Sequence, residues 1–207
     1  MKIEDTYKTI VATVEGEYTE KRSKFLSFAF PVADVEEAEL YIDEYRRKYH
    51  NARHVCYAYM LGPDRKDYRA YDDGEPSSTA GKPILGQINS NELTNVLVLV
   101  IRYFGGIKLG TGGLIQAYRE AAAIALSKAE MEIRTVDVEI DFSFEYSNMN
   151  DVMRIVKEYN AMMIDQTGYG TGCSMKVSIR KSLKKPLLDS LTQLPSIKVR
   201  NIISLTP

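Results

Sequence analysis

The chain has 207 residues, of which 44% are hydrophobic and 27% are charged, and its formal net charge at pH 7 is −1. This length fits one or two domains with an ordinary buried core, and a near-neutral chain gives no general argument for nucleic-acid binding, so any anion site must come from local clustering of charge. The N-terminus has no apolar secretory segment and no apolar run approaches the roughly 18 residues of a membrane span, so we expect a soluble cytoplasmic protein with no membrane partner.

The first two thirds of the chain mix strands with a few helices. Alternating or apolar runs predict strands at residues 6–15, 23–31, 53–61 and 95–101, with a short strand that runs on to Tyr71. The segment 16–22 is polar and is expected to form a turn. Apolar residues at helical spacing predict a helix after Asp34, its expected N-cap, and further helices at residues 82–89 and from Leu114 to about Ala129. Because strands and helices do not alternate regularly, we expect an α+β two-layer sandwich.

The last third of the chain shows a clearer order of elements. It predicts strands at 136–146, 161–169, 173–181 and 197–204, and helices at 147–159 and 182–194. The resulting order, βαββαβ, is that of a ferredoxin-like sandwich. We expect the boundary between domains at residues 133–136, which gives one domain of residues 1–134 and a second of residues 135–207.

A glycine-rich segment, residues 102–113 with the sequence RYFGGIKLGTGG, is the most informative part of the chain. It follows an apolar strand and precedes a helix, and the free NH groups and dipole of a helix N-terminus favour anions. Arg102 and Lys108 add positive charge, so the segment is typical of a phosphate or carboxylate site. It matches neither a Walker loop nor a dinucleotide fingerprint, and a tight strand-to-helix turn would explain its glycines equally well.

A second segment, residues 72–83 with the sequence DDGEPSSTAGKP, is acidic and turn-like. The hydroxyl side chains of residues 77–79 are expected to cap the helix that follows. The carboxylates of Asp72, Asp73 and Glu75, with Lys82 beyond them, could bind Mg²⁺ or perform acid–base chemistry. We favour a solvated turn over a metal site, because carboxylates this close in sequence more often form turns.

The histidines and cysteines give weaker signals. His50 and His54 have the spacing of zinc ligands on a helix, but the predicted helix ends between them. We therefore interpret His54 as part of a polar surface near the glycine-rich segment. Cys56 and Cys173 lie in different predicted domains and are expected to be buried, reduced thiols. No catalytic residue, metal ligand or cofactor is assigned.

Four motifs together resemble the IMPACT/YigZ family: residues 22–25 (RSKF), 72–76 (DDGEP), 79–83 (TAGKP) and 102–113. They follow the family's order over roughly residues 15 to 125, and the part from about 135 resembles the small second domain of the bacterial members. One departure is Ser78, where the family often has glycine, and it bears on how closely a ligand can approach. The resemblance implies a first domain similar to domain IV of elongation factor G and a second similar to that factor's final, ferredoxin-like domain.

Two neighbouring domains of translation-factor type imply RNA, the ribosome or a protein of the translation machinery as the partner. Eukaryotic members regulate translation through protein partners with an extra N-terminal module, so that mechanism is not transferred to this chain. We predict a non-enzymatic binding protein linked to translation, with a phosphate- and RNA-binding face at the glycine-rich segment. The candidate binding residues are Arg22, Lys24, Arg53, His54, Asp73, Glu75, Lys82, Arg102, Tyr103, Gly105, Gly106, Lys108, Gly110, Thr111, Gly112 and Gly113.

Two alternatives stay open at this point. The chain could be an enzyme acting on a phosphorylated small molecule or nucleotide, with Asp73 and Glu75 holding Mg²⁺ or moving a proton. It could also be a protein-interaction regulator of translation, in which Asp73 and Glu75 pair with Arg or Lys as scaffolding.

Overall fold

The computed structural model describes residues 5–204, which contacts divide into two compact units. One unit comprises residues 7–134, and the other comprises residues 135–204 together with residues 5 and 6. The chain therefore passes between the units twice, once near residue 6 and once near residue 134. Among residues 5–204, no helix is long and apolar enough to cross a lipid bilayer.

The larger unit is built on a five-stranded sheet in the order β2-β3-β6-β4-β5, in which every neighbouring pair is antiparallel. Its strands are β2 (Val14–Glu20), β3 (Ser23–Pro31), β4 (His54–Leu61), β5 (Asp67–Tyr71) and β6 (Val96–Tyr103). The central strand β6 is buried at every position from Val96 to Arg102. Since successive side chains of a strand point to opposite faces, this burial means that both faces of the sheet are covered.

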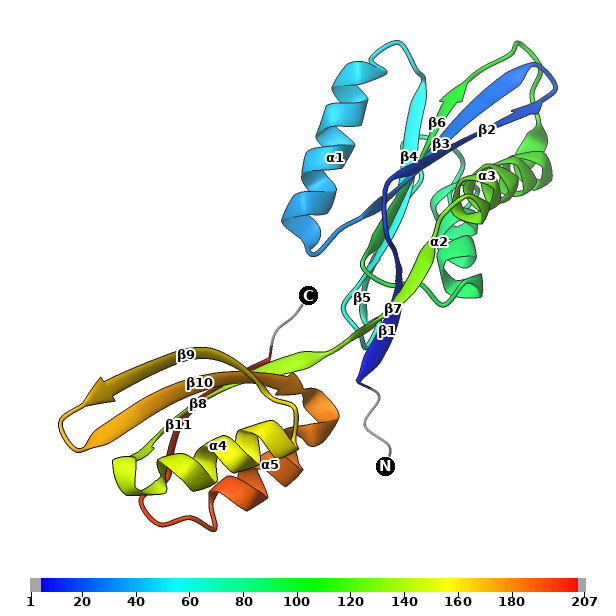
Figure 1. The fold of residues 1–207 in the computed structure, drawn as a ribbon. Coiled ribbons are helices and arrows are strands. Elements are labelled where there is room, and N and C mark those ends of the chain that lie inside the picture. Colours follow the sequence, from blue (N-terminus) through cyan, green and yellow to red (C-terminus); the bar gives the residue numbers. More distant parts are fainter. Residues whose placement is uncertain (1–4, 205–207) are drawn as a thin grey trace. The chain divides into compact units, whose positions relative to one another are not determined.

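Helices lie on both faces of this sheet (Figure 1). On one face α1 (Val35–Lys48) packs its tyrosines against β3, where the ring of Tyr41 stacks on Phe30 with centroids 4.4 Å apart. On the other face lie α2 (Gly81–Ser90) and α3 (Gly110–Ser127). The α+β class is confirmed, but this unit has three layers rather than the expected two.

The helix α1 begins as its sequence predicts, while the neighbouring segment 16–22 does not. Asp34 caps α1, because its Oδ1 accepts a hydrogen bond from Glu37 N at 2.8 Å. The turn expected at residues 16–22 is wrong, since residues 14–20 form strand β2. The inward positions of β2 include Gly16, which lies so close beneath α3 that an added Cβ would be 2.9 Å from Ala125 N. Such a close approach requires glycine, and because glycine is uncommon inside strands the sequence predicted a turn here instead.

A two-stranded ribbon accompanies the larger sheet. It pairs β1 (Thr6–Ile10) with β7 (Met131–Thr135). The single strand expected at residues 6–15 is therefore wrong, because β1 ends at Ile10 and β2 begins at Val14. Strand β7 was not predicted, since it falls where the boundary between domains was expected.

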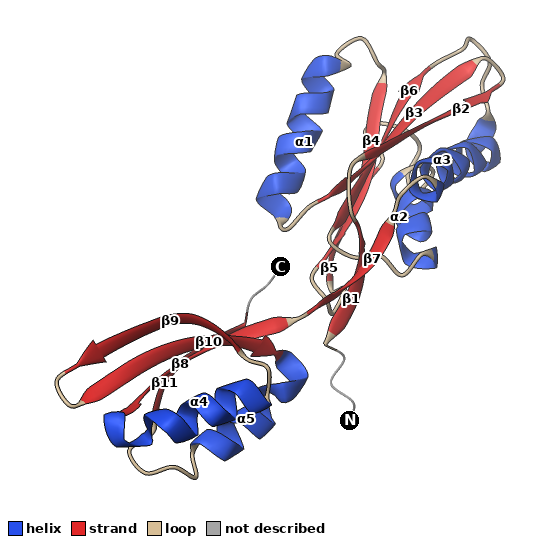
Figure 2. Ribbon diagram, viewed as in Figure 1, coloured by secondary structure: helices blue, strands red, loops and turns tan. Residues whose placement is uncertain are grey.

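The second unit has a four-stranded antiparallel sheet in the order β11-β8-β10-β9. Its elements are β8 (Asp137–Glu145), α4 (Met149–Glu158), β9 (Met162–Tyr169), β10 (Gly172–Arg180), α5 (Lys184–Leu191) and β11 (Lys198–Ser204), with short 3-10 turns at Tyr146–Asn148 and Lys181–Leu183. Both helices cover the same face of the sheet (Figure 2). This arrangement confirms the ferredoxin-like sandwich.

Residues 5 and 6 make their contacts in the second unit. The carboxylate of Asp5 accepts hydrogen bonds from Ser182 Oγ and from Arg180 Nη2, the latter at 3.1 Å. Its backbone oxygen accepts a bond from Val136 N at 2.7 Å. The start of the chain thus completes the unit that the end of the chain builds.

Candidate functional site

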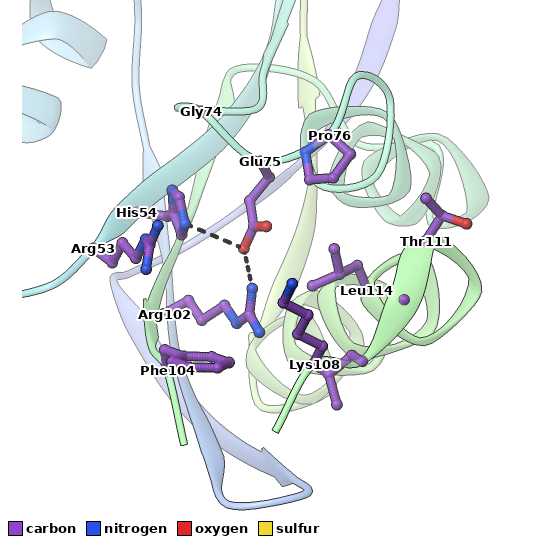
Figure 3. Close-up of a pocket in the computed structure, with 12 residues that line it drawn as sticks. Arg53, His54, Gly74, Glu75, Pro76, Arg102, Phe104, Lys108, Thr111 and Leu114 are labelled. Atoms are coloured by element: carbon purple, nitrogen blue, oxygen red, sulfur yellow. Dashed lines mark hydrogen bonds and ion pairs between the residues drawn. The ribbon is translucent and has the colours of Figure 1, made fainter. Parts of the chain in front are cut away.

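A cavity of about 440 Å³ opens in the larger unit where the acidic and glycine-rich segments meet (Figure 3). The strand register explains the meeting, because His54 of β4 lies opposite Arg102 of β6 in the antiparallel pair. The acidic turn follows β5 beside them, and the glycine-rich segment continues from β6 into α3. The lining residues are Arg53, His54, Gly74, Glu75, Pro76, Arg102, Phe104, Lys108, Leu109, Gly110, Thr111 and Leu114.

A buried ion pair forms the wall of this cavity. Arg102 Nη1 donates to Glu75 Oε1 at 2.6 Å, and the two side chains are only 7% and 4% exposed. The hydroxyl of Tyr118 donates to the same oxygen at 2.8 Å. The Arg102 guanidinium also lies between two aromatic rings, 5.5 Å from the centroid of Phe25 and 5.6 Å from that of Phe104. The charge of Arg102 is therefore balanced within the protein before any ligand arrives.

His54 is held in one tautomer by its backbone contact. Its Nδ1 lies 2.7 Å from the carbonyl oxygen of Asp73, and because a carbonyl can only accept, Nδ1 carries the hydrogen. In the neutral ring Nε2 is then a hydrogen-bond acceptor. It lies 3.9 Å from Glu75 Oε1, the oxygen that Arg102 also contacts (Figure 3).

Asp72 shapes the acidic turn by binding backbone. Its carboxylate accepts hydrogen bonds from the NH groups of Ser78, Ala80 and Gly81 at 2.8, 3.0 and 2.8 Å. It therefore caps α2, which begins at Gly81 and has no cap from its own N-cap residue, Ala80. The cap expected from residues 77–79 is wrong. The nearest of these, Thr79, donates its hydroxyl to Pro76 O instead.

Asp73 holds the same turn against β4 and α1. Its Oδ2 accepts a hydrogen bond from Val55 N at 2.7 Å, and its Oδ1 lies 3.5 Å from Arg46 Nη2. Within residues 5–204, no three His, Cys, Asp or Glu side chains gather as metal ligands would. The acidic segment thus uses its carboxylates on the protein's own NH groups and arginines.

Cys56 and Tyr118 lie behind the ion pair, away from solvent. The thiol of Cys56 is 3.3 Å from the Tyr118 hydroxyl and 3.0 Å from Asp72 O. Burial raises the pKa of the Cys56 thiol far above its usual range, and burial likewise raises the pKa of the Tyr118 hydroxyl. Neither group ionises at neutral pH. Both cysteines of the chain are free and buried, as expected.

The glycines of the glycine-rich segment have different structural reasons. A Cβ on Gly105 would lie 2.0 Å from the carbonyl carbon of Arg22, so the loop packs directly on the turn between β2 and β3. Gly106 and Gly110 have positive φ angles of 87° and 71°. Gly112 has neither constraint, with no neighbour within 4 Å of an added Cβ. Helix α3 begins at Gly110 rather than at the expected Leu114, and its first turn has no side-chain cap.

The structure gathers only part of the predicted set around the cavity. Seven candidate residues line it: Arg53, His54, Glu75, Arg102, Lys108, Gly110 and Thr111. Nine others do not line it: Arg22, Lys24, Asp73, Lys82, Tyr103, Gly105, Gly106, Gly112 and Gly113. Several of these nine have other partners: Asp73 binds Val55 N and Arg46 as described above, Lys24 pairs with Glu17 at 2.9 Å, and Tyr103 donates to Asn51 at 2.9 Å.

Sequence reasoning missed Phe104 as a wall of the cavity. Its side chain is 44% exposed although phenylalanine is ordinarily buried. The available signal was its position between the arginine and the glycines of the motif. Asp72 organises the turn without lining the cavity; the sequence favoured a turn for this segment, but not the cap that Asp72 gives to α2.

The part of the chain that forms the cavity matches a known protein domain, and the chain as a whole has relatives of known sequence and structure. Residues 21–126 match the model of the Impact N-terminal domain. The chain is 30% identical to an IMPACT family member of Haemophilus influenzae over 84% of both chains. It is 33% identical to the IMPACT family member YigZ of Escherichia coli over 70% of this chain and 72% of that protein. A solved structure described as a hypothetical protein shares the fold, with a TM-score of 0.71 and 26% identity over 98% of both chains.

Proposed function

This chain belongs to the IMPACT family, and we propose that it is a non-enzymatic binding protein linked to translation that binds an RNA phosphate in the cavity at the start of α3. The observation that carries the proposal is the pair Arg53 and Lys108. Both line the cavity, and within the described residues neither makes an ion pair or a side-chain hydrogen bond. The Lys108 side chain extends toward the Glu75–Arg102 pair (Figure 3).

The charge of the cavity supports an anionic ligand. Its lining carries three cationic side chains and the single carboxylate of Glu75, which Arg102 already balances. The uncapped first turn of α3 adds free NH groups and the positive end of the helix dipole. Phosphate fits both features. The link to translation rests on the family and on the likeness between the folds of its domains and those of translation-factor domains.

The contacts also favour one alternative over the other. The protein-interaction alternative requires Asp73 and Glu75 to pair with basic residues as scaffolding, and they pair with Arg46 and Arg102. A protein partner in translational control is therefore the second candidate function. Capture of one protein in stoichiometric amount, unchanged by nuclease treatment, would support it. The enzyme alternative lacks a comparable observation, because Asp73 does not line the cavity and Glu75 Oε1 already accepts from Arg102 and Tyr118.

Binding of short single-stranded RNA, measured by fluorescence anisotropy across a salt series, tests the first candidate. Arg53→Ala/Lys108→Ala should weaken binding and lower the slope of log affinity against log salt by about 0.7, since the one phosphate contact that is lost contributes about 0.7 on a single strand. The matched control is Lys157→Ala/Lys181→Ala, which removes the same charge from exposed positions of the second unit. Unchanged affinity and slope in the cavity variant would contradict the proposal.

A further inference from the structure

The cavity contains two hydrogen-bond acceptors that a phosphate group does not use. Phosphate oxygens at neutral pH accept hydrogen bonds, so Arg53, Lys108 and the NH groups of α3 are suitable partners for them. Acceptors on the protein require a hydrogen on the ligand. A phosphate diester carries no such hydrogen, and a ligand that fills the cavity must supply a donor close to its phosphate.

The first acceptor is Nε2 of His54. The Asp73 carbonyl fixes the hydrogen on Nδ1, so the neutral ring presents only a lone pair at Nε2. The side chain is 12% exposed, and His54 lines the cavity. Among the described residues nothing donates a hydrogen bond to Nε2, and Glu75 Oε1, 3.9 Å away, is itself an acceptor.

The second acceptor is Oε2 of Glu75. The other oxygen, Oε1, already accepts from Arg102 and Tyr118. Oε2 takes part in no hydrogen bond within residues 5–204, and it is not one of the fully enclosed atoms that lack a partner. Since Glu75 lines the cavity, this oxygen is reachable from it. A buried carboxylate oxygen gains more from a donor than an exposed one, because solvent does not compete.

We propose that His54 Nε2 accepts the one hydrogen of a ribose 2′-hydroxyl beside the phosphate, with Glu75 Oε2 as a neighbouring acceptor, so that the cavity selects RNA over DNA. The inference rests on the proposed function, because it takes the phosphate contact as given. The 2′-hydroxyl is the donor that distinguishes the two nucleic acids. It lies next to the 3′-phosphate on the sugar, and His54 and Glu75 line the same cavity as Arg53 and Lys108.

The remaining walls suit a nucleotide and not a particular base. The volume of about 440 Å³ falls within the range of small-ligand sites and exceeds the need of a bare phosphate. Phe104 offers a partly exposed ring, and stacking on an aromatic ring tolerates any base. The selectivity should therefore concern the sugar.

The test compares three single-stranded oligouridylates of equal length and sequence in the anisotropy assay: RNA, the deoxyuridine strand, and RNA with fluorine in place of each 2′-hydroxyl. Fluorine removes the donor without adding bulk. Wild-type protein should bind RNA at least tenfold more tightly than either other strand. His54→Asn keeps an amide donor for the Asp73 carbonyl but has no acceptor at the position of Nε2, so it should bind RNA as weakly as wild type binds the deoxyuridine strand. His50→Ala, an exposed histidine four residues earlier, is the matched control and should retain the preference.

The outcomes separate this inference from the proposal beneath it. Equal binding of all three strands, still dependent on Arg53 and Lys108, would overturn the ribose contact and leave the phosphate site standing. A fluorinated strand that binds as tightly as RNA would do the same without relying on any variant. Binding of none of the strands at low salt would overturn the phosphate site itself.

Discussion

Arg102 and Lys108 both line the cavity, but we expect only Arg102 to be important for the stability of the fold. Its guanidinium is nearly enclosed and is held by Glu75, whereas Lys108 lies beside it exposed and unpaired within the described residues. Arg102→Ala should cost about 3–5 kcal/mol of unfolding free energy, because it leaves a buried carboxylate without its partner. Lys108→Ala should stay within about 0.5 kcal/mol. Urea unfolding measures both, and equal small losses would show that the ion pair contributes nothing to the fold.

Asp5 provides a pH-dependent contact in the second unit. The hydrogen bond from Ser182, and then the charge of Arg180, lower the pKa of the Asp5 carboxyl below its ordinary value of 3.8. A lowered pKa in the folded state means that the ionised form stabilises the fold above that value. The contribution should disappear as the pH falls through the lowered pKa.

Asp5→Asn should therefore destabilise the second unit at pH 7 but not at a pH below the lowered pKa. Denaturant unfolding of both proteins across pH 2 to 7, followed by hydrogen exchange in residues 135–204, measures the difference. Asp189→Asn is a suitable control, since Asp189 forms an exposed pair with Lys185 on α5. A deficit of the Asp5 variant that persists unchanged at the lowest pH would refute the assignment.

At the scale of elements, the glycine-rich segment combines packing and conformational requirements. Gly105→Ala should destabilise the protein by about 1–3 kcal/mol, because its Cβ would strike the backbone of the β2–β3 turn at Arg22. Gly112→Ala should be neutral or slightly stabilising, since Gly112 lies in α3 with open space around it and alanine favours helix by up to about 1 kcal/mol. Thermal unfolding of the two variants checks the contrast. Equal effects would contradict the division of roles.

The elements that the sequence predicted well are those whose signals are local. Asp34 and the helical spacing behind it are sufficient for α1, and alternation is sufficient for the strands of the second unit. Strand β2 was not predicted because its inward position is Gly16, and the need for glycine there comes from α3, more than a hundred residues later. The third layer was not predicted for a similar reason. The amphipathic pattern of α1 indicates that one side is buried, but not which face of the sheet buries it.

The sequence could predict which residues gather at the site, but not which of them contact one another. Arg53, Lys108 and Glu75 were all chosen as candidates from their motifs, and they line one cavity. Which of them would be free was beyond the sequence. The pairing of Glu75 with Arg102 depends on the register of β4 against β6, and the cap that Asp72 gives α2 depends on the path of the turn. Long-range register decides both.

At the scale of the whole molecule, the two units have separate hydrophobic cores. Phe142 is fully buried in the core of the second unit. Phe142→Ala should cost that unit about 3–5 kcal/mol and leave residues 7–134 close to their wild-type stability. Hydrogen exchange resolved by segment measures the two units separately. Parallel loss of protection in both would mean that the chain unfolds as one cooperative body.

The contact between Asp5 and Ser182 also sets an order of events during synthesis. The two residues are 177 positions apart, so at about 5–20 residues per second Asp5 is synthesised roughly 9 to 35 s before Ser182. Strand β1 likewise waits for β7, which follows the entire larger sheet. Asp5 is thus among the last of the described residues to complete its contacts. A nascent chain stalled before residue 180 should leave Asp5 open to proteases and chaperones even when the first sheet has folded.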